Sequence, residues 1–123
     1  MTRFLDDILR QPAALASTVR FLGDGARRQL DAAVAALRRA DHVYLTGIGS
    51  SYHAVIGAAP FFHEASWSVG VQDASEMLHF GSFPPNSAVV LVSRSGQSVE
   101  VLQLLAEGVR LILWSFDRHL REK

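Results

Sequence analysis

The sequence contains no cysteine. It can therefore form no disulfide, no thiol nucleophile and no zinc site built on thiolates, a composition that suits the cytoplasm. It also has no apolar run long enough to span a bilayer, and residues 1–7 carry charge where a signal peptide needs an apolar core. We expect a cytoplasmic protein with no membrane partner.

Net charge is lacking as well, because twelve lysines and arginines balance twelve aspartates and glutamates. A balanced chain offers no broad basic surface to a polyanion, so we expect no nucleic-acid partner. The five histidines form no i, i+4 pair and have no cysteine partners, which argues against a metal site. We expect no metal and no other cofactor, and a small molecule is the ligand that fits this composition best.

The first forty residues have the spacing of amphipathic helices. Three helices are predicted, over residues 2–10, 12–22 and 26–40. The first should stop at Gln11, because Pro12 disfavours helical geometry in the residue before it. The apolar sides of the second and third helices are Leu15, Val19, Leu22, Leu30, Val34 and Leu37. We expect these helices to form an N-terminal segment over residues 1–40.

From residue 41 onward, β-rich runs alternate with helical spacing. Helices are predicted to begin near Ser51 as cap, with a kink or break near Pro60, to form a turn capped by Ser75, and to run over residues 99–106. The expected strands cover residues 43–46, 68–73, 89–92 and 109–116. Parallel neighbours need long crossovers, so this alternation predicts an α/β domain over residues 41–123. Its architecture should be three-layer αβα with a mainly parallel four-stranded sheet.

A buried strand that ends in a serine-rich loop is the most informative stretch. The loop holds Ser93, Ser95 and Ser98 around Gly96, and a helix follows it directly. The first N–H groups of a helix have no internal partner and attract anions, the serine hydroxyls can donate into the same space, and glycine tolerates positive φ. We interpret the loop as a cradle for the phosphate of a small metabolite. The alternative is that Ser95 or Ser98 merely caps the helix.

A second polar loop, Gly49 to Ser51, follows the first expected strand. In open parallel sheets, ligands bind beyond the carboxyl ends of the strands, where the strand order changes direction. Both loops lie at such ends. If the two strands are neighbours in the sheet, the loops face one pocket.

Three segments resemble the motifs of the sugar isomerase (SIS) domain family. They are Thr46-Gly47-Ile48-Gly49-Ser50-Ser51-Tyr52-His53, Asp73-Ala74-Ser75-Glu76 and Leu91-Val92-Ser93-Arg94-Ser95-Gly96-Gln97-Ser98. The nearest resemblance is to the first SIS domain in the isomerase part of glucosamine-6-phosphate synthase and its amino-sugar relatives. It implies a flavodoxin-like domain that lacks its last strand and binds a phosphorylated amino sugar or sugar, such as glucosamine 6-phosphate or fructose 6-phosphate.

The resemblance also implies which residues bind. The sugar phosphate would be held by the serine loop, and the sugar end would contact Ser50 and Ser51. The loop residues concerned are Ser93, Arg94, Ser95, Gly96 and Ser98. The family usually has glutamine in place of Arg94 and an acidic residue in place of Gln97. Arg94 either pairs with the phosphate as a charged fork or turns outward.

The residue that would transfer a proton between sugar carbons is unknown. Related enzymes use a glutamate in a segment that follows a fifth strand, usually with a second SIS domain, and this sequence ends before both. The residues present offer His53, Asp73, Glu76 and Glu100 as candidates. His53 is the best of them, because it begins a helix beside the pocket, and the alternative is that this histidine is structural. Glu76 and Glu100 lie in first turns of helices, where a carboxylate complements the helix dipole without a catalytic role.

Two other functions remain open. A non-catalytic sensor of sugar phosphates would use the same pocket without transforming its ligand. A dinucleotide-binding domain is suggested by Gly47-Ile48-Gly49 after a strand and by Asp73 near the end of the next, although Tyr52 stands where the third glycine belongs. We also expect a homodimer or a partner SIS domain, because a four-stranded domain should leave a sheet edge and apolar helix faces uncovered.

Overall fold

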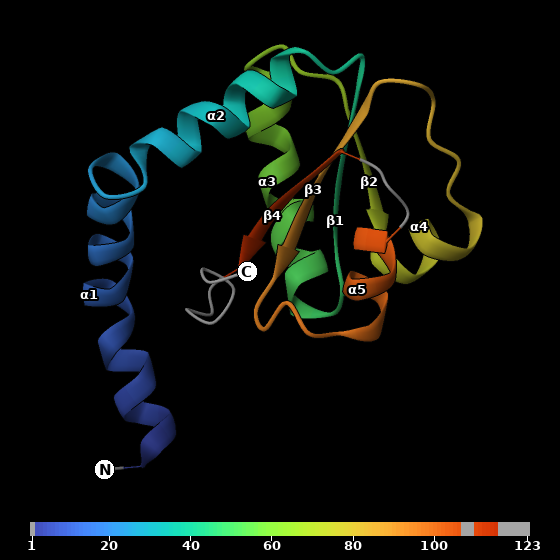
Figure 1. Ribbon diagram of the computed structural model, residues 1–123. Helices are drawn as coiled ribbons and strands as arrows, with labels where there is room; N and C mark the ends of the chain where they lie inside the picture. The colour runs from blue at the N-terminus through green and yellow to red at the C-terminus, as the bar shows by residue number, and fades with distance from the viewer. Residues whose placement is uncertain (1, 107–109, 116–123) are drawn as a thin grey trace. The chain divides into compact units, whose positions relative to one another are not determined.

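The computed structural model describes residues 2–106 and 110–115 (Figure 1). The chain forms two compact units, residues 1–35 and 36–123. Within the described residues, no helix is long and apolar enough to cross a membrane. The elements in chain order are α1 (Arg3–Gly23), α2 (Arg27–Arg38), β1 (His42–Gly47), α3 (Ser50–Glu64), β2 (Val69–Asp73), α4 (Ala74–Phe80), β3 (Ser87–Ser93), α5 (Val99–Ala106) and β4 (Arg110–Ser115).

Two helices contain a proline and continue past it, so the helix end predicted at Gln11 and the break predicted as one outcome near Pro60 do not occur, while a kink near Pro60 stays a prediction. The helices expected over residues 2–10 and 12–22 are one helix, α1, with Pro12 inside it. Likewise α3 contains Pro60 and shows no break there. A proline removes one backbone hydrogen bond, but the alanines and leucines around Pro12 are strong helix formers and extend the helix on both sides of it. The prediction of a helix end at Gln11 was wrong.

The sheet has four parallel strands in the order β2-β1-β3-β4. The residue Leu45 at the centre of β1 pairs with Val71 of β2 on one side and with Val90 of β3 on the other. Strands β1 and β2 are joined through α3, and the chain then crosses to the other side of β1 to form β3. The strand order therefore changes direction between β1 and β3. The expected parallel α/β sheet is confirmed, and β4 matches the fourth predicted strand apart from residues 109 and 116, which lie outside the described residues.

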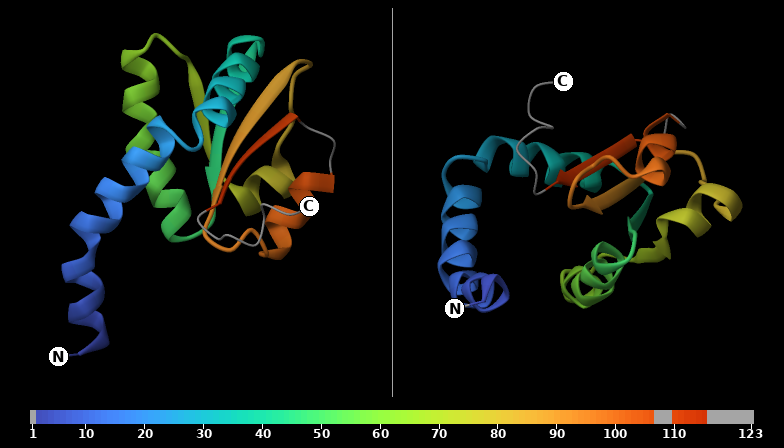
Figure 2. Two further views of the ribbon diagram at one scale, coloured as in Figure 1. Left: turned by 60° about the vertical axis from the view of Figure 1, so that its left-hand side comes forward. Right: turned by 90° about the horizontal axis from the view of Figure 1, so that it is seen from below.

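Two apolar clusters cover opposite faces of this sheet. Successive side chains of a strand point to opposite faces, so Leu45 of β1 lies in the cluster with α3, whereas Tyr44 packs against the cluster with α4 and α5. Figure 2 shows the sheet between α3 and the pair α4 and α5. The members of the first cluster are Leu37, Val43, Leu45, Val55, Ala59 and Ala88. Those of the second are Ala74, Met77, Val89, Leu91, Val101 and Leu104. The predicted three-layer αβα architecture is confirmed.

Several local predictions need correction. Helix α3 begins at Ser50 with Gly49 as its N-cap, so Ser51 lies inside the helix and does not cap it. Helix α4 is capped by Asp73, whose carboxylate Oδ1 accepts from the N–H of Ser75 at 2.8 Å. The carboxylate reaches this group because Asp73 is the extended last residue of β2, two positions before Ser75. A predicted cap at Ser75 was therefore placed two residues too late.

The predicted buried stripe of the third helix is only partly buried. In α2, Leu37 is buried in the first apolar cluster, while Leu30 is exposed and Val34 is half-buried. Leu37 belongs to the sheet unit, whereas Leu30 and Val34 belong to residues 1–35. The apolar spacing continues along α2, but only the last turn of this helix contributes to the core of the sheet unit.

The junction between β1 and α3 depends on the glycine that ends the strand. A Cβ atom on Gly47 would lie 2.8 Å from the carbonyl carbon of Ser51 and 2.9 Å from the backbone nitrogen of Tyr52. These are backbone atoms of the first turn of α3, which cannot move aside without moving the helix. Gly47 thus allows the N-terminus of α3 to lie directly against the end of β1.

Replacing Gly47→Ala should lower the free energy of unfolding by about 1–3 kcal/mol, because the added methyl group overpacks this junction. Urea denaturation, with the slope of the transition recorded, measures the change. Gly57→Ala is the matched control, since Gly57 is inside α3 and its Cβ would meet nothing within 4 Å. That control should be more stable than the parent by about 0.5–1 kcal/mol, from helix propensity alone. Equal effects of the two substitutions would contradict the close approach.

Candidate functional site

The two polar loops singled out in the sequence lie at the same edge of the sheet. They follow β1 and β3, which are parallel neighbours with Thr46 paired to Leu91. Figure 1 shows both loops at the ends to which the strand arrows point. The condition for a common site, that the two strands be adjacent, is therefore met, and the loops flank the point where the strand order changes direction.

The loop after β1 delivers the N-terminus of α3. Gly49 has φ 58°, and its carbonyl accepts from the N–H of His53, which starts the helix. No described side chain caps this end. Ser50 is exposed and Ser51 is half-buried in the first turn. The partial positive charge of a 15-residue helix and two hydroxyls are thus presented at the carboxyl edge.

The loop after β3 is held by its own serines. The buried hydroxyl oxygen of Ser93 accepts from the N–H of Gly96 at 2.8 Å, and Gly96 has φ 66°, as the sequence suggested for this glycine. The exposed hydroxyl oxygen of Ser95 accepts from the N–H of Gln97 at 3.2 Å. Both hydroxyl oxygens are therefore engaged inside the loop, although each hydroxyl keeps its hydrogen for donation.

The two serine contacts differ in strength and accessibility. The Ser93 contact is short and buried, and it fixes the conformation of the loop. The Ser95 contact is longer and exposed, so an incoming acceptor can replace it at low cost. Ser98 contributes through its backbone, because its carbonyl accepts from the N–H of Leu102 at 3.1 Å and so begins α5.

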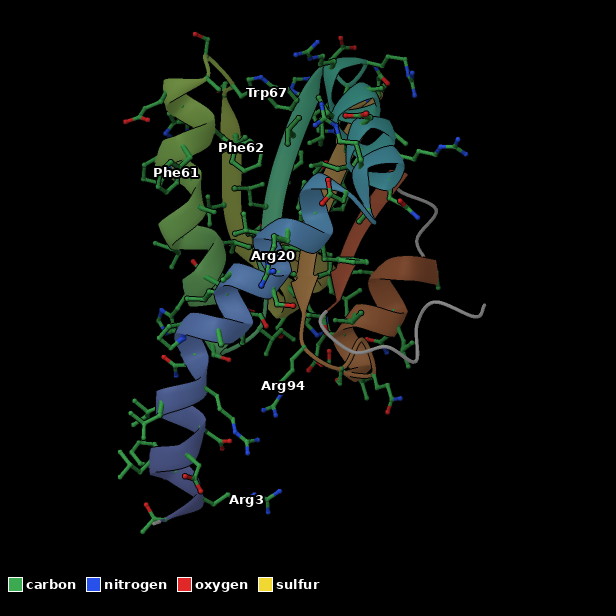
Figure 3. The ribbon with its side chains drawn as sticks, turned by 90° about the vertical axis from the view of Figure 1, so that its left-hand side faces the viewer. Arg3, Arg20, Phe61, Phe62, Trp67 and Arg94 are labelled. Carbon is green, nitrogen blue, oxygen red and sulfur yellow. The ribbon has the colours of Figure 1, made fainter. Side chains whose placement is uncertain are left out.

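Arg94 lies at the outer side of this loop and is exposed. Figure 3 shows its side chain projecting beyond the carboxyl ends of the strands. A guanidinium at this edge adds full positive charge beside the N-termini of α3 and α5.

The candidate proton-transfer residues occupy different positions on the same edge. His53 is exposed in the first turn of α3, with its ring centroid 6.1 Å from that of Tyr52. Asp73 ends β2 beside Gly47, and its carboxylate caps α4. Glu76 is exposed in α4, and Glu100 is half-buried in the first turn of α5. Among the hydrogen bonds given above, one reaches a side chain of these four residues: the N–H of Ser75 donates to the carboxylate of Asp73.

The same edge can be compared with what a metal ion or a dinucleotide would require. Among the described residues, no three histidine, aspartate or glutamate side chains come together as a metal site would require. The acidic residue that a dinucleotide site would use at the end of the second strand is Asp73, whose Oδ1 already accepts from the N–H of Ser75. The role of Gly47 in seating α3 was not recognised from the sequence, although a glycine directly after a β-rich run was the available signal.

Comparison with known proteins gives one related sequence and several related folds. The chain is 34% identical over 106 residues to glutamine–fructose-6-phosphate aminotransferase (isomerizing) of Shewanella oneidensis. This match covers 80% of the chain but only 17% of the aminotransferase, so the chain spans about a sixth of that relative's length. No protein-family profile matches the chain.

Three solved structures share the fold. Tagatose-6-phosphate ketose/aldose isomerase from Escherichia coli gives a TM-score of 0.72 at 19% identity, over 89% of this chain and 33% of that one. The C-terminal domain of glucosamine-fructose-6-phosphate aminotransferase from Francisella tularensis gives 0.61 at 21% identity, over 72% and 27%. The sugar isomerase domain of the RpiR transcription factor from Sphaerobacter thermophilus gives 0.61 at 18% identity, over 86% and 66%.

The fold and the sequence point in the same direction. The structural neighbours include an isomerase, an aminotransferase domain and the sugar isomerase domain of a transcription factor, and the related sequence is itself an isomerizing aminotransferase. The resemblance seen in the three sequence motifs is thereby confirmed. The chain has the fold of sugar isomerase (SIS) domains and is similar in sequence to part of an isomerizing aminotransferase.

Proposed function

We propose that this domain binds a phosphorylated sugar, of the class of fructose 6-phosphate or glucosamine 6-phosphate, at the carboxyl edge between β1 and β3. The observation that carries this proposal is the convergence of two serine-bearing loops and two helix N-termini at the switch point of a parallel sheet. The names of the relatives support the ligand class, since one is named for fructose 6-phosphate and another for tagatose 6-phosphate.

The phosphate is assigned to the loop after β3. There the N–H of Gln97 exchanges its contact with the Ser95 oxygen for a phosphate oxygen, and the hydroxyl of Ser95 donates its hydrogen to the same phosphate. Ser93 keeps its bond to Gly96 and preserves the loop, while Ser98 and the start of α5 complete the cradle. The guanidinium of Arg94 neutralises part of the dianion.

The sugar end is assigned to the first turn of α3. Ser50 and Ser51 present hydroxyls there, and these can donate to and accept from the hydroxyls of a sugar. Gly47 sets the distance between this turn and the phosphate loop, because it seats α3 on the end of β1. Binding of the whole ligand thus requires both loops.

A specific observation supports a second candidate, a non-catalytic sensor. One structural neighbour is the sugar isomerase domain of a transcription factor. Isomerisation needs a base that takes a proton from one sugar carbon and returns it to the next, and His53 is the exposed group in the first turn of α3 that could do so. Enzyme and sensor therefore share one ligand and differ in the chemistry of His53.

Ser95→Ala should weaken the binding of fructose 6-phosphate by about ten- to a hundredfold, the loss of one hydrogen bond to a charged group. Isothermal calorimetry on the full chain measures the affinity, and thermal unfolding should be unchanged, because the Ser95 contact is exposed. Ser68→Ala is the matched control: Ser68 is exposed and precedes β2, at the opposite edge of the sheet.

Ligand controls separate the possible outcomes of this titration. Fructose without phosphate should bind too weakly to detect, and NAD should not compete. Tighter binding of NAD than of fructose 6-phosphate would overturn the proposal in favour of a dinucleotide site. An unchanged affinity for fructose 6-phosphate in Ser95→Ala would show that the phosphate does not bind to this loop.

Arg94→Gln, which restores the residue usual in the family, should weaken the same affinity by about tenfold. The loss of affinity on raising the salt concentration should also become smaller, because one positive charge no longer faces the dianion. Arg38→Gln is the control, since it removes the same charge from α2, which ends just before β1 begins. If Arg94→Gln and Arg38→Gln have the same effect, Arg94 does not contact the phosphate.

Turnover decides between the enzyme and the sensor. If the chain is an isomerase with His53 as its base, it should convert fructose 6-phosphate to its aldose isomer, and His53→Gln should abolish conversion while changing the binding affinity less than twofold. Coupled detection of the aldose product gives the rate. Tight binding without conversion at any enzyme concentration assigns the domain to the sensor class.

A further inference from the structure

The hydroxyl of Thr46, near the end of β1, is buried without a hydrogen-bond partner. Thr46 is 0% exposed, and its Oγ1 has no partner in the part of the chain that the structure describes. Two buried hydroxyls on the neighbouring strand β3 are both engaged. That of Ser87 donates to a backbone carbonyl at 2.6 Å, and that of Ser93 accepts from a backbone N–H at 2.8 Å. Because an unpaired buried hydroxyl lowers stability, the one on Thr46 needs an explanation.

Packing alone favours valine over threonine at this position. Thr46 follows Leu45 in a mostly apolar strand, and its register partner on β3 is Leu91, which is itself 0% exposed. Valine is branched at Cβ like threonine, has the same preference for strands, and carries no polar atom that must be removed from water. The sheet therefore gains nothing from the hydroxyl of Thr46, which indicates a role at the end of the strand.

Thr46 and the start of the serine loop share one face of the sheet. Side chains alternate along a strand, so Thr46 faces the same side as Tyr44, which packs against the second apolar cluster. Leu91 belongs to that cluster, and Ser93 lies two residues further along β3 on the same face. Figure 1 shows β1 and β3 side by side, with the serine loop beyond the end of β3. The unpaired hydroxyl thus lies on the adjacent strand, close to where the loop begins.

We propose that Thr46 is a positioning residue for the loop of residues 93–98. A dianion held between this loop and the N-terminus of α3 draws the loop toward β1. The hydroxyl of Ser93 then donates its hydrogen to Oγ1 of Thr46, while its oxygen still accepts from the N–H of Gly96. These two hydrogen bonds in series strengthen each other and hold the loop against β1. The inference rests on the proposed function, and it assigns Thr46 no direct contact with the ligand.

Stability and affinity depend on Thr46 in opposite directions in this proposal. The unpaired hydroxyl lowers the stability of the domain before a ligand binds, and the hydrogen bond that it gains on binding raises the affinity. A threonine whose hydroxyl served only the folded structure would lose stability when that hydroxyl was removed, with no change in affinity.

Thr46→Val tests the proposal, by thermal unfolding and by calorimetric titration of the full chain with fructose 6-phosphate. The midpoint of unfolding should rise by about 3 °C or more, because a methyl group replaces the unpaired hydroxyl. The affinity should fall by about three- to tenfold, the loss of one neutral hydrogen bond. Thr46→Ser keeps the hydroxyl and should bind fructose 6-phosphate within about twofold of the parent chain.

Ser87→Ala is the matched control, because it removes a buried and paired hydroxyl from the other end of β3. It should lower the midpoint and leave the affinity unchanged. If Thr46→Val binds like the parent or unfolds at a lower temperature, the inference is wrong and the proposed function stands. The same holds if Thr46→Ser binds as weakly as Thr46→Val. A parent chain that does not bind fructose 6-phosphate overturns the proposed function and this inference with it.

Discussion

The parallel pairing of β1 with β3 is the constraint on which the site depends. Between them the chain completes α3, β2 and α4, so residues 47–51 and 93–98 are far apart in sequence and are brought to one edge only by this pairing. Parallel pairing also orients both following helices with their N-termini at that edge. If β3 paired with β2 instead, the serine loop would be separated from the α3 N-terminus by a strand, and the two loops could not form the anion site proposed above.

The geometry of the two loops shows a division between residues that hold the site and residues that can exchange partners. Gly47 and Ser93 are buried and make contacts that fix the backbone, one by allowing a close approach and the other by accepting the Gly96 N–H. Ser50, Ser95 and Arg94 are exposed. A rigid inner layer with an adaptable outer layer keeps the cost of ordering a ligand low, because only the outer groups must change partners.

The sequence predicted the αβα layers well, because long periodic segments are set by burial on both faces of a sheet, and α5 was assigned to the same residues that the structure shows. The sequence-based predictions were wrong where a rule for a single residue, such as proline ending a helix, was outweighed by the residues around it. Pro12 and Pro60 do not end their helices, and the caps at Gly49 and Asp73 depend on where each strand stops. The serine contacts inside the loop could not be predicted, since hydroxyl orientation follows from tertiary packing rather than from residue type.

Hydrophobic spacing in the first forty residues shows a further limit of sequence patterns. Leu15 and Leu37 both lie on apolar helix faces, yet Leu37 is buried in the sheet unit and Leu15 is two-thirds exposed. The apolar spacing predicts that each of these helix faces packs against another surface, but it does not identify that surface. For Leu37 the partner is the chain's own sheet, because Leu37 lies in the apolar cluster that contains Leu45 of β1 and Val55 of α3. The same apolar spacing therefore accompanies a buried side chain at Leu37 and an exposed one at Leu15.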